Sequence, residues 1–118
     1  MNMLSILLVS VFVSAGGSKV RLKEESPGLL ARAKVVGDVA AAAAKTRLPE
    51  ARLVGAEIEV EDGKLIYSFD FKTGGKSGTD EVTVDATTGA VLTVEHETPR
   101  DERAEKQGEA KKSAAAKK

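Results

Sequence analysis

The chain has 118 residues, enough for one small domain, and it contains no cysteine, which excludes disulfides, thiol catalysis and cysteine-ligated metals. Its 18 basic and 18 acidic residues cancel, but residues 46–97 hold 5 basic and 11 acidic side chains, whereas residues 16–45 and 98–118 each carry a net charge of +3. An acidic centre repels nucleic acid, and the few aromatic residues do not interleave with basic ones, so no nucleic-acid partner is expected.

The first element along the chain is an uncharged apolar run from Leu4 to Ala15. It is shorter than the roughly 20 residues that a membrane-spanning helix needs, and it has the length of the hydrophobic region of a signal peptide. We therefore expect residues 1–15 to be a signal peptide and the protein to be periplasmic or secreted. A buried apolar element and a misassigned start remain open, because residues 1–3 carry no Lys or Arg while Lys19 and Arg21 follow the run.

The charged residues 16–26 are expected to be a linker, after which a helix is predicted from Pro27 to about Arg47. Ser26 can cap this helix, Pro27 suits its first position, and Pro49 ends it. One apolar stripe recurs at helical spacing along it, formed by Leu29, Ala33, Val36, Ala40 and Ala43.

Asp62 and Gly63 predict a tight β-hairpin, because both positions of such a turn must accept a positive φ. A two-residue loop sets the strand register. The expected pairs are Glu61–Lys64, Val60–Leu65, Ile58–Tyr67, Ala56–Phe69 and Val54–Phe71. Glu57, Glu59 and Glu61 then share the polar face of the first strand. Such a row can bind a basic partner surface or weakly bind calcium, and it can equally be a solvated face that discourages aggregation.

A second strand pair is predicted from Asp80 to Val84 and from Ala90 to Glu97, after a flexible loop over residues 73–78. Asp85 is expected to accept hydrogen bonds from the backbone of the intervening turn, and Gly89 to close that turn in the left-handed conformation. The register of the last strand stays open, since Val91 has one parity and Leu92 and Val94 have the other.

Two features suggest chemistry and are rejected on their context. Gly75, Lys76 and Ser77 end like a phosphate-binding loop, but Asp70 stands where the motif needs glycine and a strand follows where it needs a helix. His96 is the only histidine, and it is interpreted as an edge-strand residue whose replacement by alanine is nearly silent. No catalytic residue, cofactor or metal site is therefore expected.

The charged, alanine-rich residues 98–118 cannot bury enough surface to fold alone, and we expect a tail there. It is either a solubilising segment or a weak electrostatic contact to an anionic surface. The remaining unit, residues 27–97, is expected to be α+β: one N-terminal helix packed on a three- to four-stranded antiparallel sheet.

The helix, hairpin and final strand pair together resemble the PepSY domain family. The resemblance is carried by the stretches "VAAAAAKTRLPEARLVGAEIEVEDGKLIYSFDF" and "DEVTVDATTGAVLTVE", and it covers residues 30–97. PepSY domains occur outside the cytoplasm, in propeptides of thermolysin-like metallopeptidases and in regulators of cell-wall hydrolases.

The resemblance implies an exported binding and regulatory module, not an enzyme. We expect it to inhibit or regulate a peptidase or another envelope protein by protein–protein contact, with Glu57, Glu59 and Glu61 as a candidate partner-binding face and no small-molecule substrate. The alternative is a structural envelope-associated protein that its basic C-terminal tail tethers.

Overall fold

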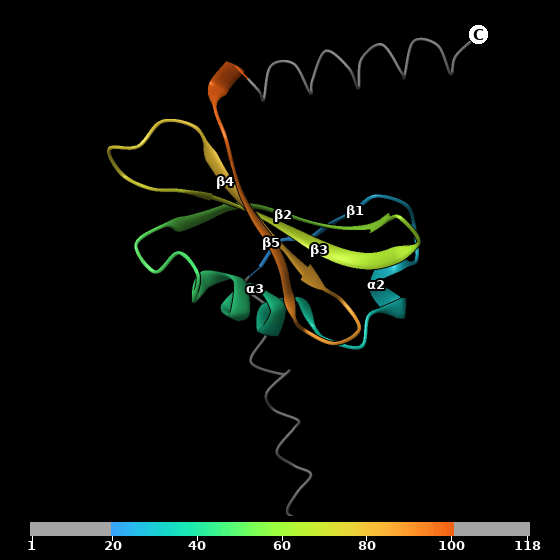
Figure 1. The fold of residues 1–118 in the computed structure, drawn as a ribbon. Coiled ribbons are helices and arrows are strands. Elements are labelled where there is room, and N and C mark those ends of the chain that lie inside the picture. Colours follow the sequence, from blue (N-terminus) through green and yellow to red (C-terminus); the bar gives the residue numbers. More distant parts are fainter. Residues whose placement is uncertain (1–19, 101–118) are drawn as a thin grey trace, which may run out of the picture.

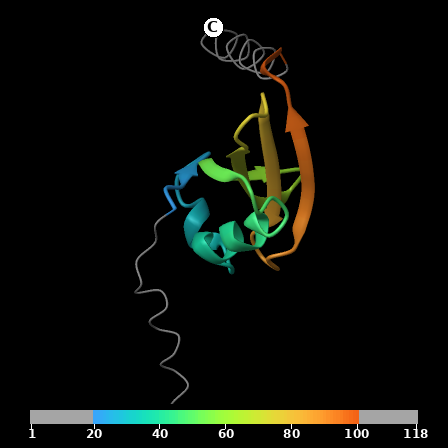
Figure 2. The ribbon, with the colours of Figure 1, turned by 90° about the vertical axis from the view of Figure 1, so that its left-hand side faces the viewer.

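A computed structural model of the protein describes residues 20–100, so the expected signal peptide and most of the expected tail lie outside the described residues. Its elements are β1 (Lys23–Glu24), α2 (Leu29–Arg32), α3 (Gly37–Lys45), β2 (Arg52–Glu61), β3 (Lys64–Lys72), β4 (Thr79–Asp85) and β5 (Val91–Glu97). The strands form one sheet in the order β1-β2-β3-β4-β5, with the helices on one of its faces (Figures 1 and 2).

The predicted α+β class and the packing of helix on sheet are confirmed. The sheet differs from the prediction, because the described residues form five strands where three or four were expected. It is also mixed, since β1 runs parallel to β2 while the other neighbouring strands are antiparallel.

The single long helix predicted from Pro27 is wrong, because the chain forms two short helices. The first helical residue is Leu29, and the preceding Gly28 has a φ of 91°. In the first turn of α2, the backbone amide of Leu30 donates to the Glu24 carboxylate at 2.7 Å. Ser26 does not cap this helix, whose N-cap residue is Gly28.

Tertiary hydrogen bonds interrupt the helical pattern between α2 and α3. The backbone amides of Lys34 and Val35 both donate to the Ala86 carbonyl, each at 3.0 Å, and the Tyr67 hydroxyl donates to the Val35 carbonyl at 2.6 Å. These bonds hold the backbone of residues 34–35 outside a helix. Val36, predicted on the buried stripe, is 57% exposed as a result.

The segment before α2, expected to be a linker, contributes a strand to the sheet. The amide of Glu25 donates to the Ile58 carbonyl at 2.9 Å, and the Glu25 carboxylate accepts from the Val60 amide at 3.0 Å. Val20 and Leu22 pack against the core from this segment. The domain boundaries at residues 15 and 98 remain predictions.

The β2–β3 hairpin has the predicted register from Glu61–Lys64 through Ala56–Phe69. The fifth predicted pair is wrong, because a bulge between Leu53 and Gly55 places Leu53, and not Val54, opposite Phe71. Val54 is the extra residue of this bulge and is exposed.

A second bulge resolves the parity of β5. Val94 lies opposite Val82, and Val91 lies opposite Val84, so Leu92 is the extra residue between them. An odd-numbered residue of β5, Val91, and an even-numbered one, Val94, therefore both lie opposite inward-pointing valines of β4. A regular strand would not allow this, because its successive side chains point to opposite faces.

The core lies between α3 and the inner face of the sheet. The largest fully buried side chains are Tyr67, Phe69, Phe71, Ile58, Val82 and Val84. On α3, the buried residues are Gly37, Ala40, Ala41 and Ala44, whose small size lets the helix approach the aromatic residues closely. A Cβ on Gly37 would lie 2.4 Å from Cδ1 of Leu22, so a larger residue at this position would displace the Leu22 side chain.

Candidate functional site

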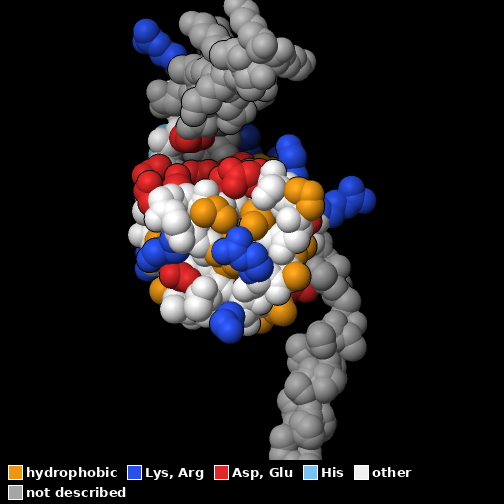
Figure 3. Space-filling view, turned by 90° about the vertical axis from the view of Figure 1, so that its right-hand side faces the viewer, with side chains coloured by type: hydrophobic (Ala, Val, Ile, Leu, Met, Phe, Trp, Pro, Cys, Tyr) orange, Lys and Arg blue, Asp and Glu red, His pale blue; other side chains and the backbone are white. Residues whose placement is uncertain are grey.

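The outer face of the sheet carries the glutamates predicted as a partner-binding face. Glu57, Glu59 and Glu61 alternate along β2 and point away from the helices, opposite Ser68, Ile66 and Lys64 of β3. The Ser68 hydroxyl donates to the Glu59 carboxylate at 2.6 Å. At the hairpin end of the molecule, acidic side chains gather in a band on the side of the sheet (Figure 3).

The strand register adds a row of carboxylates that sequence reasoning missed. Asp70 of β3 lies opposite Glu81 of β4, which lies opposite Glu95 of β5. Like charges placed directly across strands repel one another. The row could be found only once the register of the last strand was known.

A shallow cavity of about 250 Å³ opens on this outer face. It is lined by Lys23, Gly55, Ala56, Glu57, Ser68, Asp70 and Glu81. Lys23 comes from β1, where it lies opposite Glu57 and places a positive charge among the carboxylates.

The residues predicted to form structural turns lie at the ends of the two hairpins. Asp62 has a φ of 52° and Gly63 a φ of 77° in the β2–β3 turn. In the β4–β5 turn, the Asp85 carboxylate accepts hydrogen bonds from the amides of Thr87 at 2.7 Å and Thr88 at 3.1 Å. Gly89 closes this turn with a φ of 84°.

The environment of Asp85 favours its ionised form. The backbone amides of Thr87 and Thr88 lower the pKa of the carboxyl group, and the positive charge of Lys64, whose Nζ lies 3.7 Å from Oδ2, lowers it further. Burial acts in the opposite direction, but the net effect is a lowered pKa.

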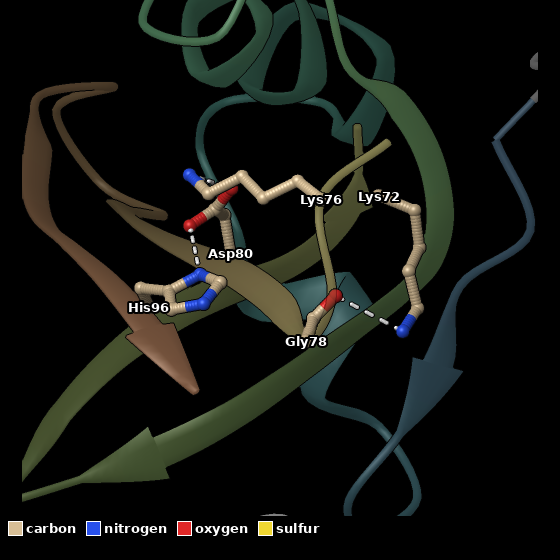
Figure 4. Close-up of polar contacts among 5 residues, drawn as sticks. All are labelled: Lys72, Lys76, Gly78, Asp80 and His96. Atoms are coloured by element: carbon tan, nitrogen blue, oxygen red, sulfur yellow. Dashed lines mark hydrogen bonds and ion pairs between the residues drawn. The ribbon is translucent and has the colours of Figure 1, made fainter. Parts of the chain in front are cut away.

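A polar cluster joins the β3–β4 loop to the end of β5. His96 Nδ1 lies 2.8 Å from Oδ1 of the buried Asp80, and Lys76 Nζ lies 3.4 Å from Oδ2 of the same carboxylate. Lys72 Nζ donates to the Gly78 carbonyl at 3.0 Å (Figure 4). His96 lies on the edge strand β5, as expected, but it also contacts a buried carboxylate, because the register places Asp80 directly opposite it.

The Asp80–His96 pair has the form in which a carboxylate orients a catalytic imidazole. The other ring nitrogen, Nε2, faces Gly78, where an added Cβ would lie 3.0 Å from it. A nucleophile side chain at this position is excluded, since the residue is glycine. The arrangement fastens the loop to β5 and is not by itself a catalytic set.

Two kinds of feature are absent from residues 20–100. No group of three or more His, Asp or Glu side chains in this range is arranged to hold a metal ion. Nor does the range contain a helix long and apolar enough to cross a membrane.

Comparison with known proteins identifies the family of this fold. The model of the PepSY family, described as the peptidase propeptide and YPEB domain, matches residues 38–95, which run from the first turn of α3 into β5. Comparison with curated proteins and with solved structures found no match. Residues 38–95 are therefore a PepSY domain.

Proposed function

We propose that the protein is an exported, non-catalytic module that regulates a peptidase, or another envelope protein, by direct contact. The observation that carries this proposal is the PepSY domain itself, which spans α3 and the four long strands. PepSY domains are generally associated with peptidase propeptides and with regulation, are typically non-catalytic, and usually act outside the cytoplasm.

The outer face of the sheet supports contact with a basic partner surface. It presents the alternating glutamates of β2, and no helix of residues 20–100 packs on it (Figure 2). Complementary charge would speed encounter with the partner and orient it more than it would raise affinity.

The test begins with the full-length chain, tagged and purified from the envelope fraction of its source. A peptidase that co-purifies is identified and assayed with and without the chain. We expect the chain to lower its activity in a saturable way. No change in activity at saturating concentrations of the chain would contradict the proposal.

A matched pair of variants tests the glutamate face. Replacing Glu57 and Glu61 by glutamine is expected to weaken the inhibition and reduce its dependence on salt. Glu50→Gln is the control, because Glu50 is an exposed carboxylate in the turn before β2, away from this face. Equal inhibition by both variants would show that the partner binds elsewhere on the molecule.

The tethering alternative rests on the net charge of +3 over residues 98–118. It predicts salt-sensitive binding to anionic vesicles that is lost when these residues are deleted, with no effect on any peptidase. The mass of the protein recovered from the periplasm or medium tests export and cleavage after Ala15.

A further inference from the structure

Strand β5 forms one edge of the sheet described over residues 20–100. In an antiparallel pair, the backbone groups of successive residues point alternately toward the partner strand and away from it. The Asp85 amide donates to the Ala90 carbonyl at 2.8 Å, so the odd-numbered residues of β4 direct their backbone toward β5. Ala86 agrees with this parity, because its amide donates to the Leu65 carbonyl, on the β3 side, at 3.0 Å.

The same parity assigns the backbone groups of β5. Thr93 and Glu95 lie opposite the odd-numbered Thr83 and Glu81, so their N–H and C=O groups belong to the β4–β5 ladder. The N–H and C=O groups of Val94 and His96 therefore point out of the sheet. We call this row of outward backbone groups the β5 edge.

One exposed apolar side chain borders the β5 edge on the helix side of the sheet. Val94 lies opposite the inward-facing Val82, yet it is 42% exposed. His96 has the same parity as Val94, so Val94 and His96 together form the helix-side border of the edge.

The opposite side of the β5 edge is acidic. Glu95 is exposed and continues the cross-strand row of carboxylates through Glu81 and Asp70. A strand added to β5 would therefore meet the apolar Val94 on one face and the negative charge of Glu95 on the other. Side chains alternate between the two faces of a strand, so apolar residues and basic residues are expected at alternate positions of the added strand.

We propose that the β5 edge binds an extended segment of a partner protein, in which apolar and basic residues alternate, as an added strand of the sheet. This mode of recognition combines backbone hydrogen bonds with pockets for alternate side chains. A second copy of this chain fits less well, since antiparallel pairing of two β5 strands brings their Glu95 carboxylates opposite or diagonal to each other. The inference deepens the proposed function by naming the contact surface, but it can be tested without a peptidase.

The test uses the full chain and a short blocked peptide in which valine and lysine alternate. Binding is followed by fluorescence anisotropy of the labelled peptide and by backbone amide shifts of the protein. We expect saturable binding with shift changes along β5. N-methylation of alternate peptide amides on the edge-facing side should weaken binding at least about tenfold, because it removes donors to the sheet edge.

Two pairs of variants test the two faces. Glu95→Lys should weaken binding of the lysine peptide about fivefold and improve binding of a peptide with glutamate in place of lysine. Glu50→Lys, a matched charge reversal in the turn before β2, should change neither. Val94→Ser should weaken binding, whereas Val54→Ser, at a valine of similar exposure on β2, should not.

Several outcomes would contradict the proposal. Equal binding by N-methylated and unmodified peptides, shift changes that spare β5, or no binding at all would overturn it. A dimer whose interface protects the amides of Val94 and His96 from exchange would assign the edge to a second copy. Peptidase inhibition without peptide binding would leave the proposed function standing and reject only this surface, and peptide binding without inhibition would do the reverse.

Discussion

Gly89 adopts a φ of 84°, which side chains with a Cβ rarely accept. An added Cβ would find ordinary contact with Val35, at 3.5 Å, so the cost of replacement comes from the backbone. Gly89→Val is expected to lower the free energy of unfolding by about 1–3 kcal/mol in urea denaturation. Gly74→Ala serves as the control, since Gly74 has open space around it and no positive φ. Equal midpoints for both variants would show that the β4–β5 turn does not need glycine.

The lowered pKa of Asp85 predicts how stability depends on pH. The unfolded chain takes up a proton near the ordinary value of 3.8, while the folded protein keeps the carboxylate ionised to lower pH. Because the unfolded state binds more protons in this interval, stability rises with pH there. The contribution is fully present above about pH 3.8 and is lost as the pH falls through the folded pKa.

Asp85→Asn separates the charge of this residue from its hydrogen bonds, since the amide oxygen can still accept from Thr87 and Thr88. We expect the variant to flatten the acid limb of stability against pH, measured by urea denaturation from pH 2 to pH 6 (about the range in which carboxyl groups titrate). An unchanged acid limb would contradict the assignment to Asp85.

His96 contributes to stability through the buried carboxylate of Asp80. His96→Ala removes one hydrogen bond to this carboxylate and leaves Lys76 as its remaining side-chain partner among the contacts described. We expect a loss of about 1 kcal/mol, in place of the silent replacement predicted from sequence. A double-mutant cycle with Asp80→Ala checks this, because strictly additive effects would mean that the two side chains do not interact.

At the scale of the element, the backbone parity of β5 predicts where the strand tolerates proline. The N–H of Glu95 belongs to the ladder, whereas the N–H of Val94 points outward. Glu95→Pro should therefore lose at least about 1 kcal/mol more than Glu95→Ala, while Val94→Pro and Val94→Ala should be similar. If proline were instead tolerated at Glu95 and costly at Val94 in urea denaturation, the N–H of Val94 would belong to the ladder. The β5 edge would then lose its basis.

The strands were largely predictable because alternation and turn chemistry are local. The Asp62-Gly63 turn set the register of β2 and β3 as far as Ala56. The bulges at Val54 and Leu92 were not predictable, because an extra residue changes little in the local pattern but shifts every pair beyond it. The pairs beyond the second bulge include Asp80–His96, which is why that contact was missed.

At the scale of the whole molecule, the segment before α2 is part of the folded unit. Leu22 is half-buried against the core and touches the position of Gly37. Leu22→Ala should lower the free energy of unfolding by about 1–2 kcal/mol, whereas the more exposed Leu30→Ala should have a smaller effect. If both substitutions lowered the free energy of unfolding by the same small amount in urea denaturation, this segment would be a linker and not part of the folded unit.

The sequence by itself determined the α+β class, the four long strands and the PepSY domain, because periodicity and turn residues are read within a few positions of the chain. Only the tertiary structure decided the break between α2 and α3, the parallel strand β1, the carboxylate row and the Asp80–His96 pair. Each of these depends on groups far apart in sequence, such as the Ala86 carbonyl that accepts from Lys34 and Val35. Local propensity cannot encode such contacts, since they exist only after the sheet has set its register.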